Sequence, residues 1–171
     1  MQHLESGQQR EAKMAFGRGT DAAQWTLEYE RVEGRFWWAV NCLEEGRLGG
    51  KWAAYWALRG AKPRLESAAQ LDESFHFAGP LRVLGRIAHL APPRVGGGLE
   101  VAKGYFERAL AITDNSTTRL YYAELLLDMG DIGLAKQQVE AILAAPDDED
   151  WRWEQERDRR KTKELLAKVS V

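Results

Sequence analysis

The chain has 171 residues, of which 44% are hydrophobic and 29% are charged, and its net charge is -2. These values are those of a globular domain and exclude the disordered and collagen-like classes, and the lack of a basic excess argues against nucleic acid as a partner. Cys42 is the only cysteine, which excludes a disulfide within the chain and a metal cage built on cysteines.

The first residues, MQHLESGQQREAK, lack the apolar segment of a secretory signal, and the longest apolar run, WAAYWAL, is too short to span a membrane. We therefore expect no membrane insertion and, for the sequence as given, a cytoplasmic location. If an export or lipoprotein signal has been removed, the expected location is the periplasm.

Helical periodicity dominates the chain, and strand-like alternation is missing. The pattern predicts helices over residues 7–17, 21–31, 33–46, 51–60, 63–72, 80–90, 99–112, 117–129, 132–145 and 150–168. Glycines and prolines separate them, and Gly79-Pro80 suits a helix start because proline at the first helical position lacks an N–H that would be unpaired anyway. The predicted class is all-α.

Three of the predicted helices share one apolar spacing, with three residues separated by four and then three positions. The sets are Ala102, Phe106 and Ala109; Ala135, Val139 and Ile142; and Ala61, Leu65 and Ala68. Each set follows a candidate first helix, so the pattern indicates repeated helix pairs.

The repeat resembles the tetratricopeptide repeat (TPR), because Leu84 and Gly85 match its L-G pair and Ala102 and Phe106 match its A-x3-F pair. The first unit departs from the pattern with Asn41 where glycine is usual, and the first two units carry extra residues. The resemblance implies an all-α, right-handed solenoid of antiparallel helix pairs that forms a single domain over residues 1–171. In it, residues 1–32 form N-terminal helices, 33–145 about three degenerate repeats and 146–171 a capping helix.

Three segments, RFWWAVN, AGPLRVLGRIAHLAP and LYYAELLLDMGD, together resemble one TPR subgroup. This is the T component of TRAP transporters, often called TatT, whose members are commonly exported lipoproteins. The resemblance implies a non-enzymatic accessory protein that binds a protein, a peptide or a small organic acid in a concave groove. The alternative is a cytoplasmic protein–protein interaction adaptor, and homo-oligomerisation stays open for both.

Polar stripes on otherwise apolar helices provide the candidate binding residues. In the TPR alignment these stripes line the groove, and the candidates are Trp38, Cys42, Arg82, Arg86, His89, Tyr121, Glu124 and Asp128. Two interpretations stay open. The arginines bind an acidic ligand or peptide, or they neutralise Glu124 and Asp128 across adjacent helices, because a buried charge demands a partner.

Catalytic and metal-binding motifs are absent, so we expect no enzyme, no cofactor and no metal. The glycines of PPRVGGGLEVAK could cradle a phosphate, but the stretch lacks the Walker A pattern and favours an inter-helix turn. The acidic run DDED lacks the spacing of a calcium loop and favours a solvated turn just before a helix, where acids complement the helix dipole. A Cys42–His–Asp arrangement stays open, although a lone cysteine on a helix is more typical of packing.

Tryptophans and charges mark the two ends of the chain. Most of the tryptophans in the first third are expected in packing; the ones in question are Trp25, Trp37, Trp52 and Trp56. The last helix is expected to be held by Trp151, Trp153 and Leu165–Leu166 around a charged middle, EQERDRRKTK. Basic residues in that middle could contact nucleic acid, but acids interleave with them and disfavour it.

Overall fold

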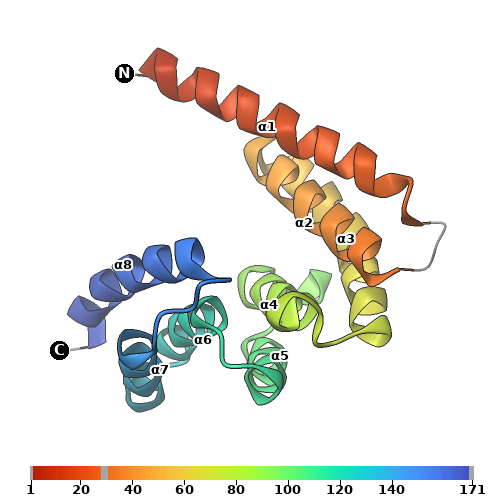
Figure 1. Ribbon diagram of the computed structural model, residues 1–171. Helices are drawn as coiled ribbons and strands as arrows, with labels where there is room; N and C mark the ends of the chain where they lie inside the picture. Colours follow the sequence, from red (N-terminus) through yellow and green to blue (C-terminus); the bar gives the residue numbers. More distant parts are fainter. Residues whose placement is uncertain (1, 28–30, 170–171) are drawn as a thin grey trace. The chain divides into compact units, whose positions relative to one another are not determined.

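A computed structural model of the chain describes residues 2–27 and 31–169 (Figure 1). All regular structure in these residues is helical, which confirms the all-α prediction. The helices are α1 (Gln2–Gln24), α2 (Val32–Leu48), α3 (Lys51–Leu71), α4 (Phe75–Leu90), the short 3-10 helix η2 (Pro93–Val95), α5 (Leu99–Ile112), α6 (Ser116–Asp128), α7 (Ile132–Ala144) and α8 (Arg152–Val169).

The chain divides into two compact units, unit 1 (residues 1–84) and unit 2 (residues 85–171), and the boundary falls inside α4. In unit 1, α2 packs against both α1 and α3. In unit 2, α6 packs against α5, α7 and α8. Each unit is described by itself below.

The N-terminal helix of unit 1 corrects one prediction. The pattern predicts helices over 7–17 and 21–31, whereas α1 runs without a break through both Gly17 and Gly19. Gly19 serves close packing, because a Cβ there would lie 2.7 Å from the side chain of Asn41 on α2. The rest of the second predicted helix includes residues 28–30, which lie outside the described residues.

A second correction concerns Pro63, which the sequence suggests as a separator of two helices. The structure places Pro63 inside α3, which is one helix from Lys51 to Leu71. Ala61, Leu65 and Ala68, the apolar set expected there, are fully buried on the inner side of α3. Burial on both sides of the proline offsets the backbone hydrogen bond that proline cannot donate.

Helix α4 begins with a left-handed turn. His76, Phe77 and Ala78 have φ values of 52°, 57° and 54°, and regular right-handed helix follows, in agreement with the predicted start near Pro80. Each L-residue in this conformation costs about 1–2 kcal/mol, so other contacts must hold the turn. The rings of Phe36, Phe75 and His76 pack together there, with His76 also 4.8 Å from the Trp37 ring.

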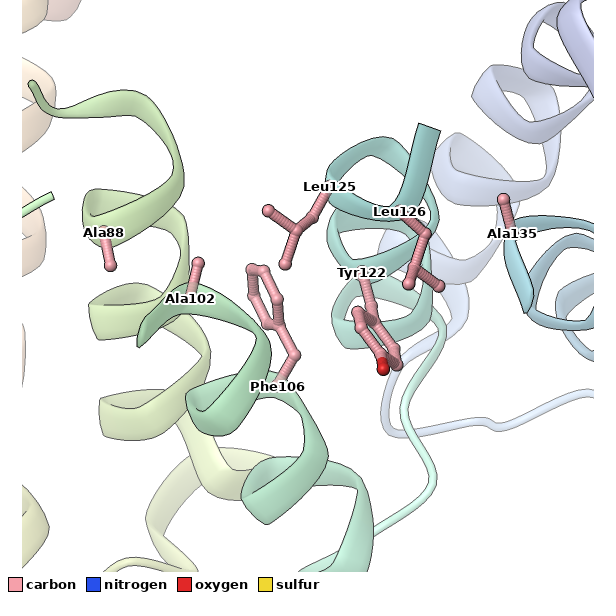
Figure 2. Packing of buried hydrophobic residues seen from close by; sticks show 7 residues of the cluster. All are labelled: Ala88, Ala102, Phe106, Tyr122, Leu125, Leu126 and Ala135. Carbon is pink, nitrogen blue, oxygen red and sulfur yellow. The ribbon is translucent and has the colours of Figure 1, made fainter. Parts of the chain in front are cut away.

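The core of unit 2 is built from the repeated apolar positions (Figure 2). Figure 2 shows Phe106 of α5 pointing toward α6, and the same cluster of buried residues also includes Ala88, Ala102, Tyr122, Leu125, Leu126 and Ala135. Gly85 lets α4 approach this core, because a Cβ at that position would lie 2.7 Å from the Phe106 ring. A second cluster joins α6, α7 and α8 through Leu120, Ala123, Val139, Ile142 and Leu165.

Candidate functional site

Five of the eight candidate binding residues meet on one surface of unit 2, named here the α4–α6 cluster. Helix α4 contributes Arg86 and His89, one turn apart, and α6 contributes Tyr121, Glu124 and Asp128 from one face. Arg86 Nη1 lies 2.6 Å from Glu124 Oε2, and the Arg86 guanidinium lies 4.5 Å from the centre of the Tyr121 ring. The arginine is thus fixed by a carboxylate and by a cation–π contact.

His89 extends this cluster toward Asp128. Its Nδ1 lies 3.2 Å from Arg86 Nη1, and its Nε2 lies 2.8 Å from Asp128 Oδ2. A guanidinium only donates hydrogen bonds, so Nδ1 accepts, and Nε2–H donates to Asp128. Both ring nitrogens are engaged in this arrangement, and the side chain is only 3% exposed. His89 acts as a fixed bridge between Arg86 and Asp128.

The charges of the α4–α6 cluster bear on what it can bind. Glu124 already neutralises Arg86, while Asp128 is 66% exposed and leaves one carboxylate facing solvent. An acidic ligand would have to displace Glu124 from Arg86. The cluster as built instead offers a carboxylate and a tyrosine ring, groups that suit a cation or a hydrogen-bond donor of a partner.

Arg82 has a different environment from the one expected for a groove residue. It is buried in unit 1, and its guanidinium donates to the carbonyl oxygens of Phe77 at 2.8 Å and His76 at 3.4 Å. These bonds satisfy carbonyl groups of the left-handed turn. Arg82 therefore braces the start of α4.

Trp38 and Cys42 lie in α2 of unit 1. The Arg64 guanidinium lies 3.7 Å from the centre of the Trp38 ring. Burial, together with the charge of Glu45, raises the pKa of the Cys42 thiol, against the opposite effect of Arg64. A thiol that stays protonated at neutral pH is a poor nucleophile, so the geometry does not favour a catalytic role for Cys42.

The glycine-rich stretch forms a closed turn. The amides of Gly96, Gly97 and Gly98 donate to the carbonyl oxygens of Pro93, Pro92 and Ala88. Gly96 has φ of 84°, and a Cβ on Gly97 would collide with the Ala91 carbonyl. Because these amides already donate within the chain, the structure favours the inter-helix turn over a phosphate-binding loop.

A buried polar network at α8 was not expected from the sequence. Asp158 is fully buried and accepts hydrogen bonds from Ser116 Oγ at 2.9 Å and from the Thr117 hydroxyl, both at the start of α6. Arg157 binds the other carboxylate oxygen at 2.8 Å, and the Trp151 indole donates to Thr117 Oγ1 at 3.1 Å. Burial alone lowers the pKa of Arg157, but hydrogen bonding and the charge of Asp158 outweigh it and raise that pKa.

This network corrects the prediction of which residues anchor the last helix. Trp151 and Leu165 are buried as expected, but Trp153 is 78% exposed and holds nothing in place. Asp158 stands in a run of charges of both signs, so periodicity carries no signal for its burial. The polar triplet Ser-Thr-Thr at 116–118 and the Asn115 cap, which accepts from the Thr117 and Thr118 amides, are the only local hints.

The DDED run precedes α8 as a turn. Asp147 pairs with Arg159 at 2.6 Å, and Asp148 accepts from the Asp150 amide. In the part of the chain that the structure describes, no three His, Cys, Asp or Glu side chains gather in a way that could hold a metal ion. Within the same residues, no helix combines the length and the apolar character needed to cross a membrane.

Comparison with known proteins bears on the identity of the chain. A model of the family described as TRAP transporter T-component matches residues 4–170. No curated protein matches the chain. Since the family match extends over nearly the entire sequence, it confirms the resemblance to the T component of TRAP transporters, and the chain belongs to the TRAP transporter T-component family.

Proposed function

We propose that this chain is a non-enzymatic scaffold of a TRAP transporter and that a transporter protein docks on the α4–α6 cluster. The cluster carries the proposal because it is polar, rigid and partly exposed. Arg86 is held by Glu124, Tyr121 and His89 at once, and Asp128 faces solvent. Side chains fixed before binding lose little conformational entropy when a partner docks.

The proposal includes a TPR-like solenoid with α8 as its capping helix, in a single domain. The packing of unit 2 supports it: Gly85 lies against Phe106, and the repeat positions Ala102 and Ala135 are buried in the same cluster. In such a solenoid, α4 and α6 are the first helices of consecutive repeats. First helices that lie side by side form a continuous concave surface, which suits an extended partner.

The chemistry of the cluster favours a basic group on the partner. Asp128 is the exposed carboxylate, and Tyr121 adds an aromatic face that cations bind. A small organic acid is the weaker alternative, because Glu124 already occupies Arg86. The family supports a role among transporter proteins and gives no support to catalysis. The raised pKa of the Cys42 thiol and the bridging role of His89 also argue against a catalytic role for these two residues.

Titrating the purified chain against the permease and the substrate-binding subunit of its TRAP transporter tests this function. We expect Asp128→Asn to weaken binding about tenfold, the effect of losing one charge-assisted hydrogen bond of roughly 1.5 kcal/mol. Arg86→Ala removes the guanidinium that fixes Tyr121 and Glu124, so it should also weaken binding. It should lower the free energy of unfolding by no more than about 1 kcal/mol, because its ion pair is partly exposed. Arg160→Ala removes the same charge from an exposed position of α8 and should leave both quantities unchanged.

Measuring affinity and stability on the same variants separates the two interpretations of the cluster. If Arg86→Ala lowers stability and binding stays intact, the cluster is a set of structural ion pairs and the proposed docking surface is wrong. If instead a small dicarboxylate raises the melting temperature and Arg86→Ala abolishes that shift, the organic-acid alternative replaces it.

A further inference from the structure

The outer side of α3 carries an aromatic surface that the proposed function does not use. We name it the α3 aromatic face and define it by Trp52, Tyr55, Trp56 and Arg59. Trp52 and Trp56 are one helical turn apart and are 80% and 64% exposed. The opposite side of the helix holds the buried residues Ala57, Ala61, Leu65 and Ala68. The tryptophans therefore project away from the core of unit 1, contrary to the expectation that they serve in packing.

The stretch of chain that contains this face carries charge of one sign. No acidic residue occurs between Glu45 and Glu66, whereas the same stretch holds five basic ones: Arg47, Lys51, Arg59, Lys62 and Arg64. The chain as a whole carries -2, so this stretch is a local exception. Arg64 turns inward onto Trp38, and Arg47 pairs with Glu44, but Lys51 and Arg59 are exposed beside the tryptophans.

Arg59 links the cations to the aromatic rings. Its guanidinium lies 5.9 Å from the centres of both the Tyr55 and Trp56 rings, and its Nη1 donates to the Tyr55 hydroxyl at 3.2 Å. The Tyr55 and Trp56 rings meet edge to face with their centroids 5.4 Å apart, a separation typical of such pairs. These contacts hold the Arg59 guanidinium next to the rings of Tyr55 and Trp56.

This combination fits a lipid surface. Tryptophan and tyrosine favour the boundary between headgroups and acyl chains because they join an apolar ring to a polar tip, and Lys and Arg are drawn to anionic lipids. The cores of protein–protein interfaces favour Trp, Tyr and Arg but are depleted of Lys, and exposed Lys51 adjoins Trp52 directly. We infer that the α3 aromatic face adsorbs to an anionic phospholipid surface, with α3 lying in the plane of the interface.

Such adsorption is peripheral and dependent on salt. Each basic residue near an anionic membrane strengthens binding about fivefold, which corresponds to about 1 kcal/mol. This attraction falls within a Debye length, about 8 Å at physiological ionic strength, so added salt weakens it. The tryptophans supply the part of the binding that salt leaves intact.

Co-sedimentation of the full chain with vesicles tests the inference. One set of vesicles is pure phosphatidylcholine, and the other is an equimolar mixture of phosphatidylcholine and phosphatidylglycerol. We expect binding to the anionic vesicles only, weakening with salt. The double variant Trp52→Ala/Trp56→Ala should lose at least about tenfold in affinity, and Lys51→Glu/Arg59→Glu should lose as much. Trp153→Ala is the matched control, since it removes an equally exposed tryptophan from α8 and should bind like the unmodified chain.

Circular dichroism shows that each variant is folded, and two variants of different chemistry guard against a folding defect in one of them. Absence of binding to anionic vesicles overturns the inference, and so does binding that survives both double variants. Light scattering distinguishes a second copy as the occupant: self-association that the double tryptophan variant abolishes, without vesicle binding, assigns the face to contacts between copies. Loss of affinity for the transporter proteins in that variant, again without vesicle binding, assigns it to a protein partner.

Discussion

The start of α8 and the outer side of α3 each use a tryptophan and an arginine, but in opposite ways. Just before α8, Trp151 is buried and donates to Thr117, and within α8 Arg157 pairs with the buried Asp158. On α3, Trp56 and Arg59 lie against each other at the surface. The polar groups of α8 therefore satisfy one another inside unit 2, and those of α3 face outward from unit 1.

The difference predicts where substitutions act. A buried carboxylate is stable only while its partners remain, so changes at the α8 network should appear in the free energy of unfolding. An exposed aromatic side chain contributes little to folding, so changes on α3 should appear in binding alone. The following predictions, from the largest expected effect to the smallest, test this contrast between the units.

Replacing Asp158 should have the largest effect on stability. Asp158→Ala leaves the buried Ser116 and Thr117 hydroxyls without their acceptor and removes the carboxylate that pairs with the Arg157 guanidinium. We expect a loss of about 3 kcal/mol in the free energy of unfolding, measured with urea. Asp147→Ala breaks an ion pair whose carboxylate is exposed and should cost at most about 1 kcal/mol. Equal losses in the two variants would remove the basis for treating the α8 network as a buried anchor.

Two glycines of unit 2 should respond in opposite directions to the same substitution. Gly85→Ala pushes a methyl group into the Phe106 ring and should destabilise the chain by about 1–3 kcal/mol. A Cβ on Gly104, within α5, meets nothing within 4 Å, so Gly104→Ala should stabilise it by about 0.5–1 kcal/mol. Thermal unfolding of both variants measures the difference. A stable Gly85→Ala variant would show that α4 does not pack against α5 at this glycine.

The left-handed turn of unit 1 gives a smaller effect. Ala78→Gly relieves about 1–2 kcal/mol of backbone strain and loses about 0.8 kcal/mol of buried methyl group. The free energy of unfolding should therefore stay level or rise slightly. Ala61→Gly, at an equally buried but right-handed position of α3, should lower it by about 2 kcal/mol. Similar losses at both positions would mean that the turn is not strained.

The smallest expected effect is on the reactivity of the Cys42 thiol and not on the stability of the chain. Because burial and Glu45 raise the pKa of this thiol, its alkylation by iodoacetamide should reach half its maximal rate at a higher pH than that of a free thiol. Glu45→Gln should move this midpoint to lower pH, since it removes the second cause of the shift. A midpoint at or below that of a free thiol would reopen the nucleophile interpretation for Cys42.

Local periodicity predicted the repeat core well. The three sets of apolar residues, from Ala61 to Ile142, are all fully buried, and α5 has the bounds expected for it. The candidate residues Arg86, His89, Tyr121, Glu124 and Asp128 also gather as their helical spacing suggested. Spacing succeeds here because a helix presents every third or fourth residue on one side, whatever it packs against.

The sequence by itself thus determined the helical class, the apolar faces and the family signature, since these depend on residues within one or two turns of each other. Tertiary structure decided the rest. Pro63 stays within α3 because burial on either side of it offsets one lost hydrogen bond, and Arg82 reaches back to carbonyls that only the left-handed turn exposes. Trp151 and Trp52 each lie within one residue of the start of a helix, but only Trp151 meets another helix that covers it and accepts its N–H. Whether a polar or aromatic side chain is buried depends on which sequence-distant element packs against it, and the local sequence pattern does not specify that element.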